Sequence, residues 1–250
     1  MKLFALEAGT SGPTVVLLHG FGGSHSVWDA VVPQLAERCR VLAYDLPGHR
    51  NSHPWPETGK PKVAVDAVLA DLSNQGIEQF HVAGHSMGGA IAMLMALEAP
   101  QRISSMSLFA PGGFGSEINA RLLARSAAAT TSSELRPTLE AMTGWSTPVE
   151  DETVMALATW RAVEGQSDAL VALSRSITRD GRQGAIPRER MAELDMPISL
   201  AWGTIDNVLP VAQTAALPPQ FALHLLEGIG HMLPQEVPDF VAQLIAKTTR

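Results

Sequence analysis

A glycine-flanked serine is the first group in this sequence that could do chemistry. Ser86 lies in a G-x-S-x-G pentapeptide that begins at Gly84. Residues 79–83 before it are typical of a short buried strand, and residues 90–98 after it are strong helix formers. A sharp strand-to-helix turn would force Ser86 to a positive φ and set its hydroxyl at a helix N-terminus. The sequence therefore predicts a nucleophilic serine, with a glycine-rich packing turn as the structural alternative.

A serine hydroxyl becomes a nucleophile when a base takes its proton and an acid orients that base. His231 and Asp206 each follow a predicted strand. We predict that Ser86, His231 and Asp206 are nucleophile, base and acid. Of the rival acids, Asp195 precedes its strand and Asp45 precedes the serine in the chain, which favours Asp206. Simpler alternatives are a helix cap at Asp206 and a structural role for His231.

Two backbone amides are predicted to stabilise an oxyanion beside this serine. One belongs to Met87, which directly follows Ser86, and the other to Phe21, in a His-Gly-Phe-Gly sequence after an early strand. The histidines of the chain show no metal-ligand spacing such as H-x-x-x-H. We therefore expect no metal and no cofactor.

The segments that must position these groups alternate between strand and helix. Continuous apolar runs predict strands at residues 15–18, 40–44, 79–83, 104–110, 197–202 and 222–226. Helices are expected over residues 24–35, 63–72, 90–98, 210–216 and 237–246. This alternation indicates an α/β fold, with a mostly parallel central sheet, right-handed crossovers and flanking helices.

One long segment, residues 114–196, breaks the alternation with helical patterns alone. We expect a core domain of residues 1–113 and 197–250 and a helical lid of residues 114–196. The lid would cover the carboxyl edge of the sheet, where open α/β sheets bind ligands. Predicted substrate contacts are His85, Trp145 and Trp160, with packing inside the lid as the alternative for the tryptophans.

The charged residues of this lid are spaced like outer helical faces. We expect its arginines to be solvated or paired, which favours an uncharged acyl group as substrate. These arginines are Arg121, Arg125, Arg161, Arg175 and Arg182.

Composition narrows the class of protein. The chain has 250 residues, of which 46% are hydrophobic, which suits one large α/β domain with an insertion. Its formal charge is −7 without a basic run, so no nucleic-acid partner is expected. One cysteine, Cys39, allows no internal disulfide, and neither a signal peptide nor a membrane span is visible. We expect a cytoplasmic protein that acts on a small acyl substrate and binds no membrane; its oligomeric state stays open.

In these features the sequence resembles the α/β-hydrolase superfamily over nearly its whole length. The resemblance is carried by residues 19–22, 45–49, 84–89, 203–206 and 230–231 and by the chain order Ser86, Asp206, His231. The family's D-x-P-G-H-G pattern has glycine where this chain has Arg50. More narrowly, residues 112–119 and 180–183 look like the hydrolase-fold acyltransferase component of acetoin dehydrogenase complexes. Such proteins usually carry an N-terminal lipoyl domain, whereas this sequence begins directly with the hydrolase part.

The resemblance implies a serine hydrolase that cleaves a carboxylic ester or related acyl substrate through an acyl-enzyme on Ser86. Three alternatives stay open: acyl transfer to a thiol or alcohol, carbon–carbon bond hydrolysis of aromatic ring-cleavage products, and a slow-turnover ligand receptor on the same fold. The carbon–carbon hydrolases resemble this chain but often carry Asn before the serine and Trp after the histidine. Here those positions hold His85 and Met232.

Overall fold

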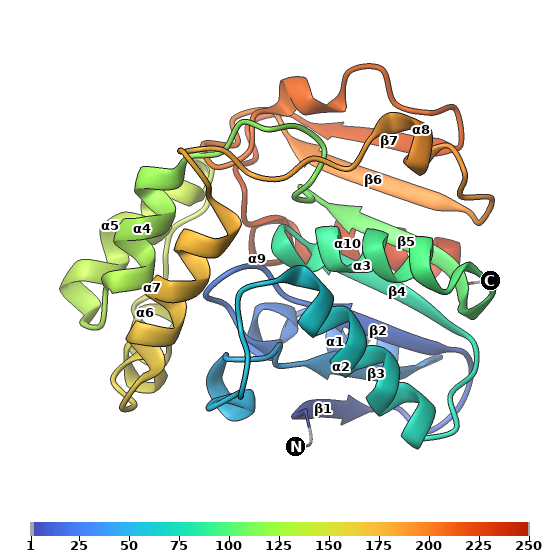
Figure 1. Cartoon of the computed structure of the whole chain (residues 1–250), viewed down its shortest axis with the longest axis horizontal. Helices are drawn as coiled ribbons and strands as arrows, with labels where there is room; N and C mark the ends of the chain where they lie inside the picture. The colour runs from blue at the N-terminus through green and yellow to red at the C-terminus, as the bar shows by residue number, and fades with distance from the viewer. Residues whose placement is uncertain (1–2, 250) are drawn as a thin grey trace.

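A seven-stranded sheet lies at the centre of the computed structural model, which describes residues 3–249 (Figure 1). The strand order is β1-β3-β2-β4-β5-β6-β7, and β1 alone runs antiparallel to its neighbour. The strands are β1 (Ala5–Ala8), β2 (Thr14–Leu18), β3 (Arg40–Tyr44), β4 (Phe80–His85), β5 (Ile103–Phe109), β6 (Ile198–Gly203) and β7 (Phe221–Leu226). The predicted α/β class with a mostly parallel sheet is confirmed.

Burial on both faces of the sheet explains why the inner strands could be predicted from apolar runs, whereas the edge strand β7 has an apolar run in which Leu223 and Leu225 are exposed. Val15 to Leu18 of β2 are fully buried, and every residue of β6 is buried. The strand that was not predicted, β1, has no fully buried position and pairs with the edge of β3. Pairing with β3, rather than its own apolar pattern, makes this segment a strand.

Helices cover both faces of the sheet. On one face α2 contacts α3, and on the other α1 contacts α10 (Figure 1). The α-helices of the core are α1 (Val32–Ala36), α2 (Pro61–Asn74), α3 (Met87–Glu98), α8 (Arg188–Met191), α9 (Leu233–Glu236) and α10 (Pro238–Thr248). Short 3₁₀ turns are η1 (His25–Trp28), η2 (Arg50–Ser52), η3 (Pro100–Arg102) and η4 (Val211–Thr214).

Two predicted helices differ in the structure. The segment at residues 24–35 is split into η1 and α1, because Pro33 lacks an amide proton and begins a new helix. The segment at residues 210–216 forms only the turn η4. Its backbone becomes left-handed at Ala216, with φ 53°, so no α-helix continues.

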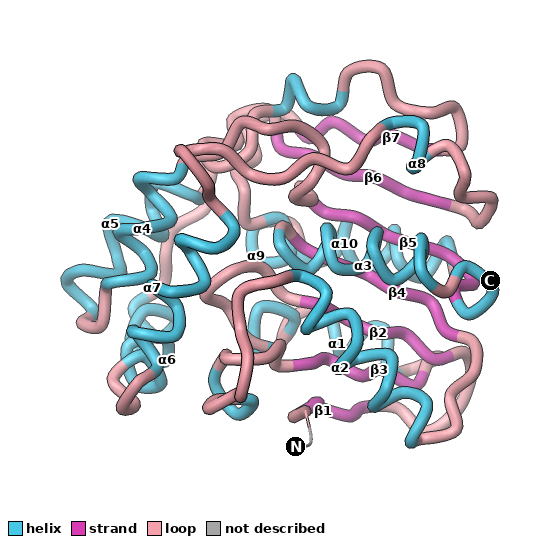
Figure 2. Tube along the Cα trace, in the orientation of Figure 1, coloured by secondary structure: helices cyan, strands magenta, loops and turns pink. Residues whose placement is uncertain are grey.

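Four helices stand apart from the sheet and form the lid: α4 (Ala120–Ala128), α5 (Ser132–Met142), α6 (Asp151–Arg161) and α7 (Gln166–Ile177). In the lid α4 contacts α7 and α5 contacts α6, around small apolar clusters such as Ala127, Trp160 and Leu170. Long loops join this group to the rest (Figure 2). The segment after α7 returns to the core, where Met191 is fully buried and Gln220 donates to its carbonyl.

The carboxyl ends of the parallel strands face this lid. Ser86 follows β4, Asp206 follows β6 and His231 follows β7, so three distant parts of the chain end at one edge. A cavity that is lined by Ser86 and His231 is also lined by Leu123 and Trp160 of the lid. The lid therefore roofs the edge of the sheet on which the predicted chemistry lies.

Replacing Gly88 tests how tightly the strand and helix meet at this edge. A Cβ at Gly88 would overlap the carbonyl oxygen of Leu18, whereas a Cβ at Gly184 would meet nothing within 4 Å. We expect Gly88→Ala to lower the free energy of unfolding by about 2 kcal/mol or more, since backbone must move. Gly184→Ala is the matched control and should leave it nearly unchanged. Urea denaturation measures both; equal stability of the two variants would contradict the close packing.

Candidate active site

The backbone at Ser86 has the strained geometry that the pentapeptide predicts. Its φ is 53° and its ψ is −117°, and it directly precedes α3. The Ser86 amide donates to the Phe109 carbonyl at 3.0 Å, and the Ser86 carbonyl accepts from Gly112 at 2.9 Å. A Cβ at Gly84 would overlap the Gly88 carbonyl oxygen. Glycine at positions 84 and 88 thus permits the sharp turn that exposes the Ser86 hydroxyl at the start of α3.

A continuous hydrogen-bonded row joins Ser86, His231 and Asp206. His231 Nε2 lies 2.9 Å from Ser86 Oγ, and His231 Nδ1 lies 2.8 Å from Asp206 Oδ2. The carboxylate only accepts, so Nδ1 carries the ring proton and the bare Nε2 accepts from the serine hydroxyl. Both the histidine and the carboxylate side chains are almost completely buried. The structure brings the three predicted residues together in the order that a proton relay needs.

Asp206 also serves the turn that follows it. Its Oδ1 accepts from the amides of Val208 and Leu209, each at 2.8 Å, while its Oδ2 is left for His231. Asp206 caps no helix, because the next helical turn, η4, begins only at Val211; one carboxylate oxygen holds this turn and the other accepts from His231. These three donors, the two amides and His231 Nδ1, belong to the chain itself, so folding rather than a ligand fixes the orientation of the carboxylate.

The rival acid, Asp45, belongs to a different network. It is fully buried, and its oxygens accept from the His25 amide, from His25 Nδ1 and from Asn51. Burial by itself would raise the pKa of Asp45, but the hydrogen bonds from His25 and the charge interaction with His19 hold that pKa below its usual value. Asp45 makes no hydrogen bond to His231, so this geometry gives it no part in orienting that ring.

His85 packs beneath the histidine of the row. Its Nε2 donates to the His231 carbonyl at 2.8 Å, and the two rings lie 4.9 Å apart. Burial lowers the pKa of His85 to about 3, so the ring is neutral. The side chain is only 2% exposed. These contacts hold the His231 backbone; His85 also lines the cavity in front of Ser86, and its contact with substrate stays a prediction.

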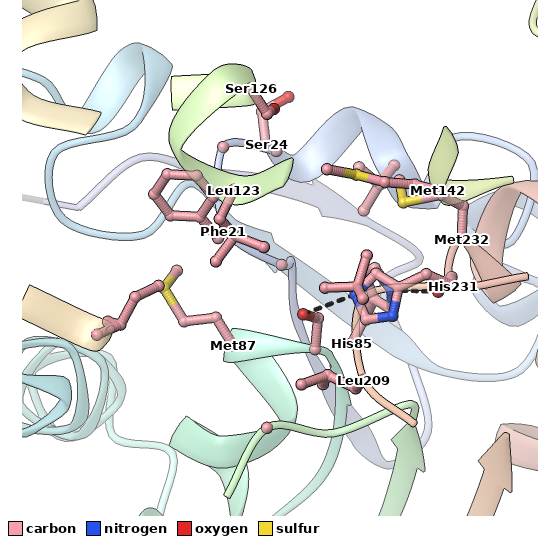
Figure 3. A pocket seen from close by; sticks show the side chains of 18 of the residues that line it. Phe21, Ser24, His85, Met87, Leu123, Ser126, Met142, Leu209, His231 and Met232 are labelled. Atoms are coloured by element: carbon pink, nitrogen blue, oxygen red, sulfur yellow. Dashed lines mark hydrogen bonds between the residues drawn. The ribbon is translucent and has the colours of Figure 1, made fainter. Parts of the chain in front are cut away.

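The loop that contains Phe21 lies directly against the serine. A Cβ at Gly20 would lie 3.0 Å from the Ser86 Cβ, so only glycine lets the loop come this close. Within residues 3–249, neither the Phe21 amide nor the Met87 amide donates to a protein acceptor. Both residues line the same cavity as Ser86 (Figure 3). Two available amides at this place fit the predicted oxyanion hole.

Two buried histidines that the sequence analysis did not single out shape this loop. His19 Nε2 accepts from the Leu46 amide at 2.9 Å, so its Nδ1 carries the proton and donates to the Gly20 carbonyl at 2.7 Å. His49 Nε2 accepts from the Gly22 amide at 3.2 Å. Burial lowers the pKa of His19 to about 4 and holds that of His49 well below 6.5. Their places in the His-Gly and Gly-His motifs are the signal that could have found them.

The cavity in front of Ser86 has a volume of about 770 Å³. Side chains of Phe21, Met87 and Leu123 lie on one side of this cavity, and those of Met142 and Met232 lie near His231, so the wall of the cavity is largely apolar (Figure 3). Trp160 lines this cavity as predicted.

The prediction that Trp145 contacts substrate is wrong, because this side chain is 87% exposed and does not line the cavity. Trp145 follows α5 in a loop, where helical spacing carries no information on which way a side chain faces.

One lid arginine also departs from the prediction. Arg121, Arg125, Arg175 and Arg182 are exposed as expected, whereas Arg161 is only 1% exposed. Its guanidinium donates to three backbone carbonyls of two segments, those of Ser126 and Ala127 in α4 and that of Gly22, instead of facing water. The spacing on α6 could not reveal acceptors that come from elsewhere in the chain.

Within residues 3–249, no group of three or more His, Cys, Asp or Glu side chains is arranged to hold a metal ion. No helix in that range is both long enough and apolar enough to cross a membrane.

Buried neutral histidines make the stability of this region sensitive to acid. A histidine whose pKa is lowered by folding binds fewer protons when folded than when unfolded. For His85 and His19 the free energy of unfolding should therefore fall as the pH drops from about 6.5 towards 4. His85→Asn removes one such group, so its unfolding free energy should depend less steeply on pH between 6.5 and 4.5. Urea titrations across this range test it; equal slopes for both proteins would contradict the neutral buried ring.

The comparison with known proteins agrees with the fold. Residues 15–244 match the sequence pattern of a family described as "Alpha/beta hydrolase family". The chain is 33% identical over 237 residues to the dihydrolipoyllysine-residue acetyltransferase component of the acetoin cleaving system of Cupriavidus necator. That alignment covers 94% of this chain but only 63% of the relative, so the chain spans less than two thirds of that protein.

Solved structures show the same fold. One is a meta-cleavage product hydrolase from Pseudomonas fluorescens, with a TM-score of 0.88 and 21% sequence identity. The superposition covers 98% of this chain and 93% of the hydrolase chain. A carboxylesterase from Bacillus subtilis has a TM-score of 0.79 at 20% identity, over 99% of this chain and 92% of its own. The family match supports an enzyme. With its seven-stranded sheet, its strained serine turn and a family match that spans residues 15–244, the chain belongs to the α/β hydrolase family.

Proposed function

We propose that this protein is a serine hydrolase that cleaves a carboxylic ester or a related acyl substrate through an acyl-enzyme on Ser86. The observation that carries the proposal is the hydrogen-bonded row of Ser86, His231 and Asp206 at the floor of an apolar cavity. The same row is buried beside two amides that lack a protein acceptor within residues 3–249. A neutral base, an oriented proton and an oxyanion site are the parts that acyl transfer to serine requires.

The proposed reaction follows from these positions. His231 Nε2 takes the hydroxyl proton while Ser86 Oγ attacks the carbonyl carbon, and the oxyanion accepts hydrogen bonds from Phe21 and Met87. Collapse breaks the bond to the leaving alcohol, which receives the proton from His231. Water then attacks the acyl-enzyme by the same route and releases the acid. Throughout, Asp206 holds the ring and stabilises the imidazolium.

The shape of the cavity supports an uncharged acyl group of small to medium size. Its wall near His231 is apolar, and Arg161, the buried cation at its edge, is already committed to backbone carbonyls. Near His231 a carboxylate or phosphate would lose water against apolar side chains, whereas two arginines that line this cavity, Arg50 and Arg161, already donate to groups of the chain.

Acyl transfer is a second candidate, and the 33% identity with an acetyltransferase component favours it. The row of Ser86, His231 and Asp206 serves either reaction, because a thiol can replace water at the acyl-enzyme. Product analysis with an activated acetyl ester separates the two. A hydrolase gives acetate in the presence of a soluble dithiol, whereas a transferase gives the S-acetyl product. Cleavage of a vinylogous diketone would instead favour carbon–carbon bond hydrolysis.

Ser86→Ala removes the attacking oxygen and keeps the rest of the site. We expect turnover of an activated ester to fall by at least about 10³-fold with little change in the thermal unfolding midpoint. A serine-directed fluorophosphonate should modify Ser86 in the wild-type protein, as read by peptide mass mapping. Retention of most of the activity in the variant, or labelling at another serine, would remove Ser86 as nucleophile.

Asp206→Asn tests the acid, with Asp45→Asn as its control. The two amides of Val208 and Leu209 need the acceptor oxygen at position 206, so the new NH₂ group would face His231. That ring must then carry its proton on Nε2, where it cannot accept from Ser86. We expect kcat to fall by about 10³- to 10⁴-fold, against a much smaller change in Asp45→Asn. Steady-state kinetics decides, and the reverse ranking would assign the acid role to Asp45.

A further inference from the structure

Arg161 is a buried cation whose hydrogen bonds all go to backbone. Its Nη2 donates to the Gly22 carbonyl at 3.0 Å, and its Nη1 donates to the Ser126 carbonyl at 3.0 Å and weakly to the Ala127 carbonyl at 3.5 Å. Within residues 3–249, no carboxylate lies within ion-pair distance of this guanidinium. Burying a charged group costs free energy unless its hydrogen bonds compensate for the lost water, so the bonds that Arg161 makes are important for the fold or for function.

The bond to Gly22 leads directly to the Phe21 amide. The Gly22 carbonyl and the Gly23 amide belong to one peptide group, and that amide donates to the Gly20 carbonyl at 3.1 Å. The Gly20 carbonyl in turn shares its peptide group with the Phe21 amide. In a trans peptide the carbonyl and the amide point in opposite directions. A row of two peptide groups therefore runs from Arg161 to the Phe21 amide.

A second contact from the lid reaches the loop at Gly22 through the neighbouring turn at residues 48–50. Gln166 begins α7, is 1% exposed, and clasps the turn at residues 48–50. Its side-chain amide donates to the Gly48 carbonyl at 2.7 Å and its oxygen accepts from the Arg50 amide at 3.0 Å. His49, inside this turn, accepts from the Gly22 amide at 3.2 Å. Both peptide groups of Gly22 are thus fixed by contacts that end in the lid.

Close packing makes the Arg161 contact specific. Gly22 has a φ of 67°, and a Cβ there would overlap Arg161 Nη2. The guanidinium also lies over the Trp160 ring, 4.9 Å from its centroid, which keeps it in place on α6. A hydrogen bond from a charged donor polarises the peptide group that accepts it, and this effect passes along a row of hydrogen bonds.

We propose that Arg161 is a positioning residue for the reaction: through the Gly22 and Gly20 peptide groups it aims the Phe21 amide at the oxyanion, so that the oxyanion hole is complete only when the lid is seated. This inference rests on the proposed function at Ser86. It assigns to the lid a part in the chemical step, beside its part in shaping the cavity. Gln166 supports the same loop through His49.

The test compares Arg161→Met with the matched control Arg125→Met, an exposed arginine on the neighbouring helix α4. Activity is expressed per site that a fluorophosphonate labels to completion, so unfolded protein does not count. We expect Arg161→Met to lower kcat by about 10- to 100-fold, with KM within about threefold of the wild type. Arg125→Met should keep wild-type values. Arg161→Lys should recover part of kcat, because an ammonium group can still donate to Gly22.

A trifluoromethyl ketone provides a readout that mere loss of stability would not move. Its carbonyl carbon bonds to Ser86 Oγ, the serine proton passes to His231, and the carbonyl oxygen becomes an oxyanion. In Arg161→Met its inhibition constant should rise by the same factor by which kcat/KM falls. Affinity for an unreactive alcohol analogue of the ketone should stay unchanged.

The outcomes separate this inference from the proposed function. If Ser86→Ala keeps its activity or the wild type is not labelled, the proposed function fails. If Ser86 is confirmed but Arg161→Met keeps kcat per labelled site within twofold, or changes only KM, the positioning role is overturned. Should Arg161→Met not fold, Gln166→Met takes its place, with an expected fall in kcat of about fivefold; an unchanged kcat there also overturns the inference.

Discussion

The close approach of β4, the helix α3 and the end of β2 fixes the point from which the rest of this molecule is arranged. Gly84 and Gly88 leave no room for a Cβ against neighbouring carbonyls, and between them Ser86 adopts a left-handed backbone conformation. Hydrogen bonds from Ser86 to Phe109 and from Gly112 to Ser86 tie this turn to β5. The strain is maintained because strand and helix on both sides are held by the core. A flexible loop could not keep a serine in this conformation.

Parallel strands then bring the partners of the serine to the same edge. The turns after β6 and β7 are bonded to each other, since Thr204 donates to Leu226 and Ile205 donates to Ile229. These bonds set the distance between the segments that carry Asp206 and His231. The His231 amide also donates to the Met142 carbonyl at the end of α5. Placement of the histidine therefore depends on both the sheet and the lid.

Much of this could be predicted from the sequence, because it rests on local patterns. Apolar runs predict buried strands, and the G-x-S-x-G motif around Ser86 predicts a strained strand-to-helix turn. What failed depends on contacts between distant segments: β1 becomes a strand only beside β3, and Arg161 finds its acceptor at Gly22, 139 residues away. Trp145 failed for a related reason, since a loop side chain has no periodicity from which a direction follows. The side chains of the lid that face the cavity could not be predicted from helical spacing, because the lid helices have apolar contacts with the cavity and with one another.

In the proposed reaction, the separate roles of the two Asp206 oxygens affect the speed of proton transfer. A carboxylate that accepted from His231 alone could rotate about its last side-chain bond and would have to be reoriented each time the imidazolium formed. Here the amides of Val208 and Leu209 hold the other oxygen, so that rotation is blocked before any substrate arrives. The dipoles of the turn stay as they are while charge develops on the ring, and little reorganisation is needed as the barrier is crossed.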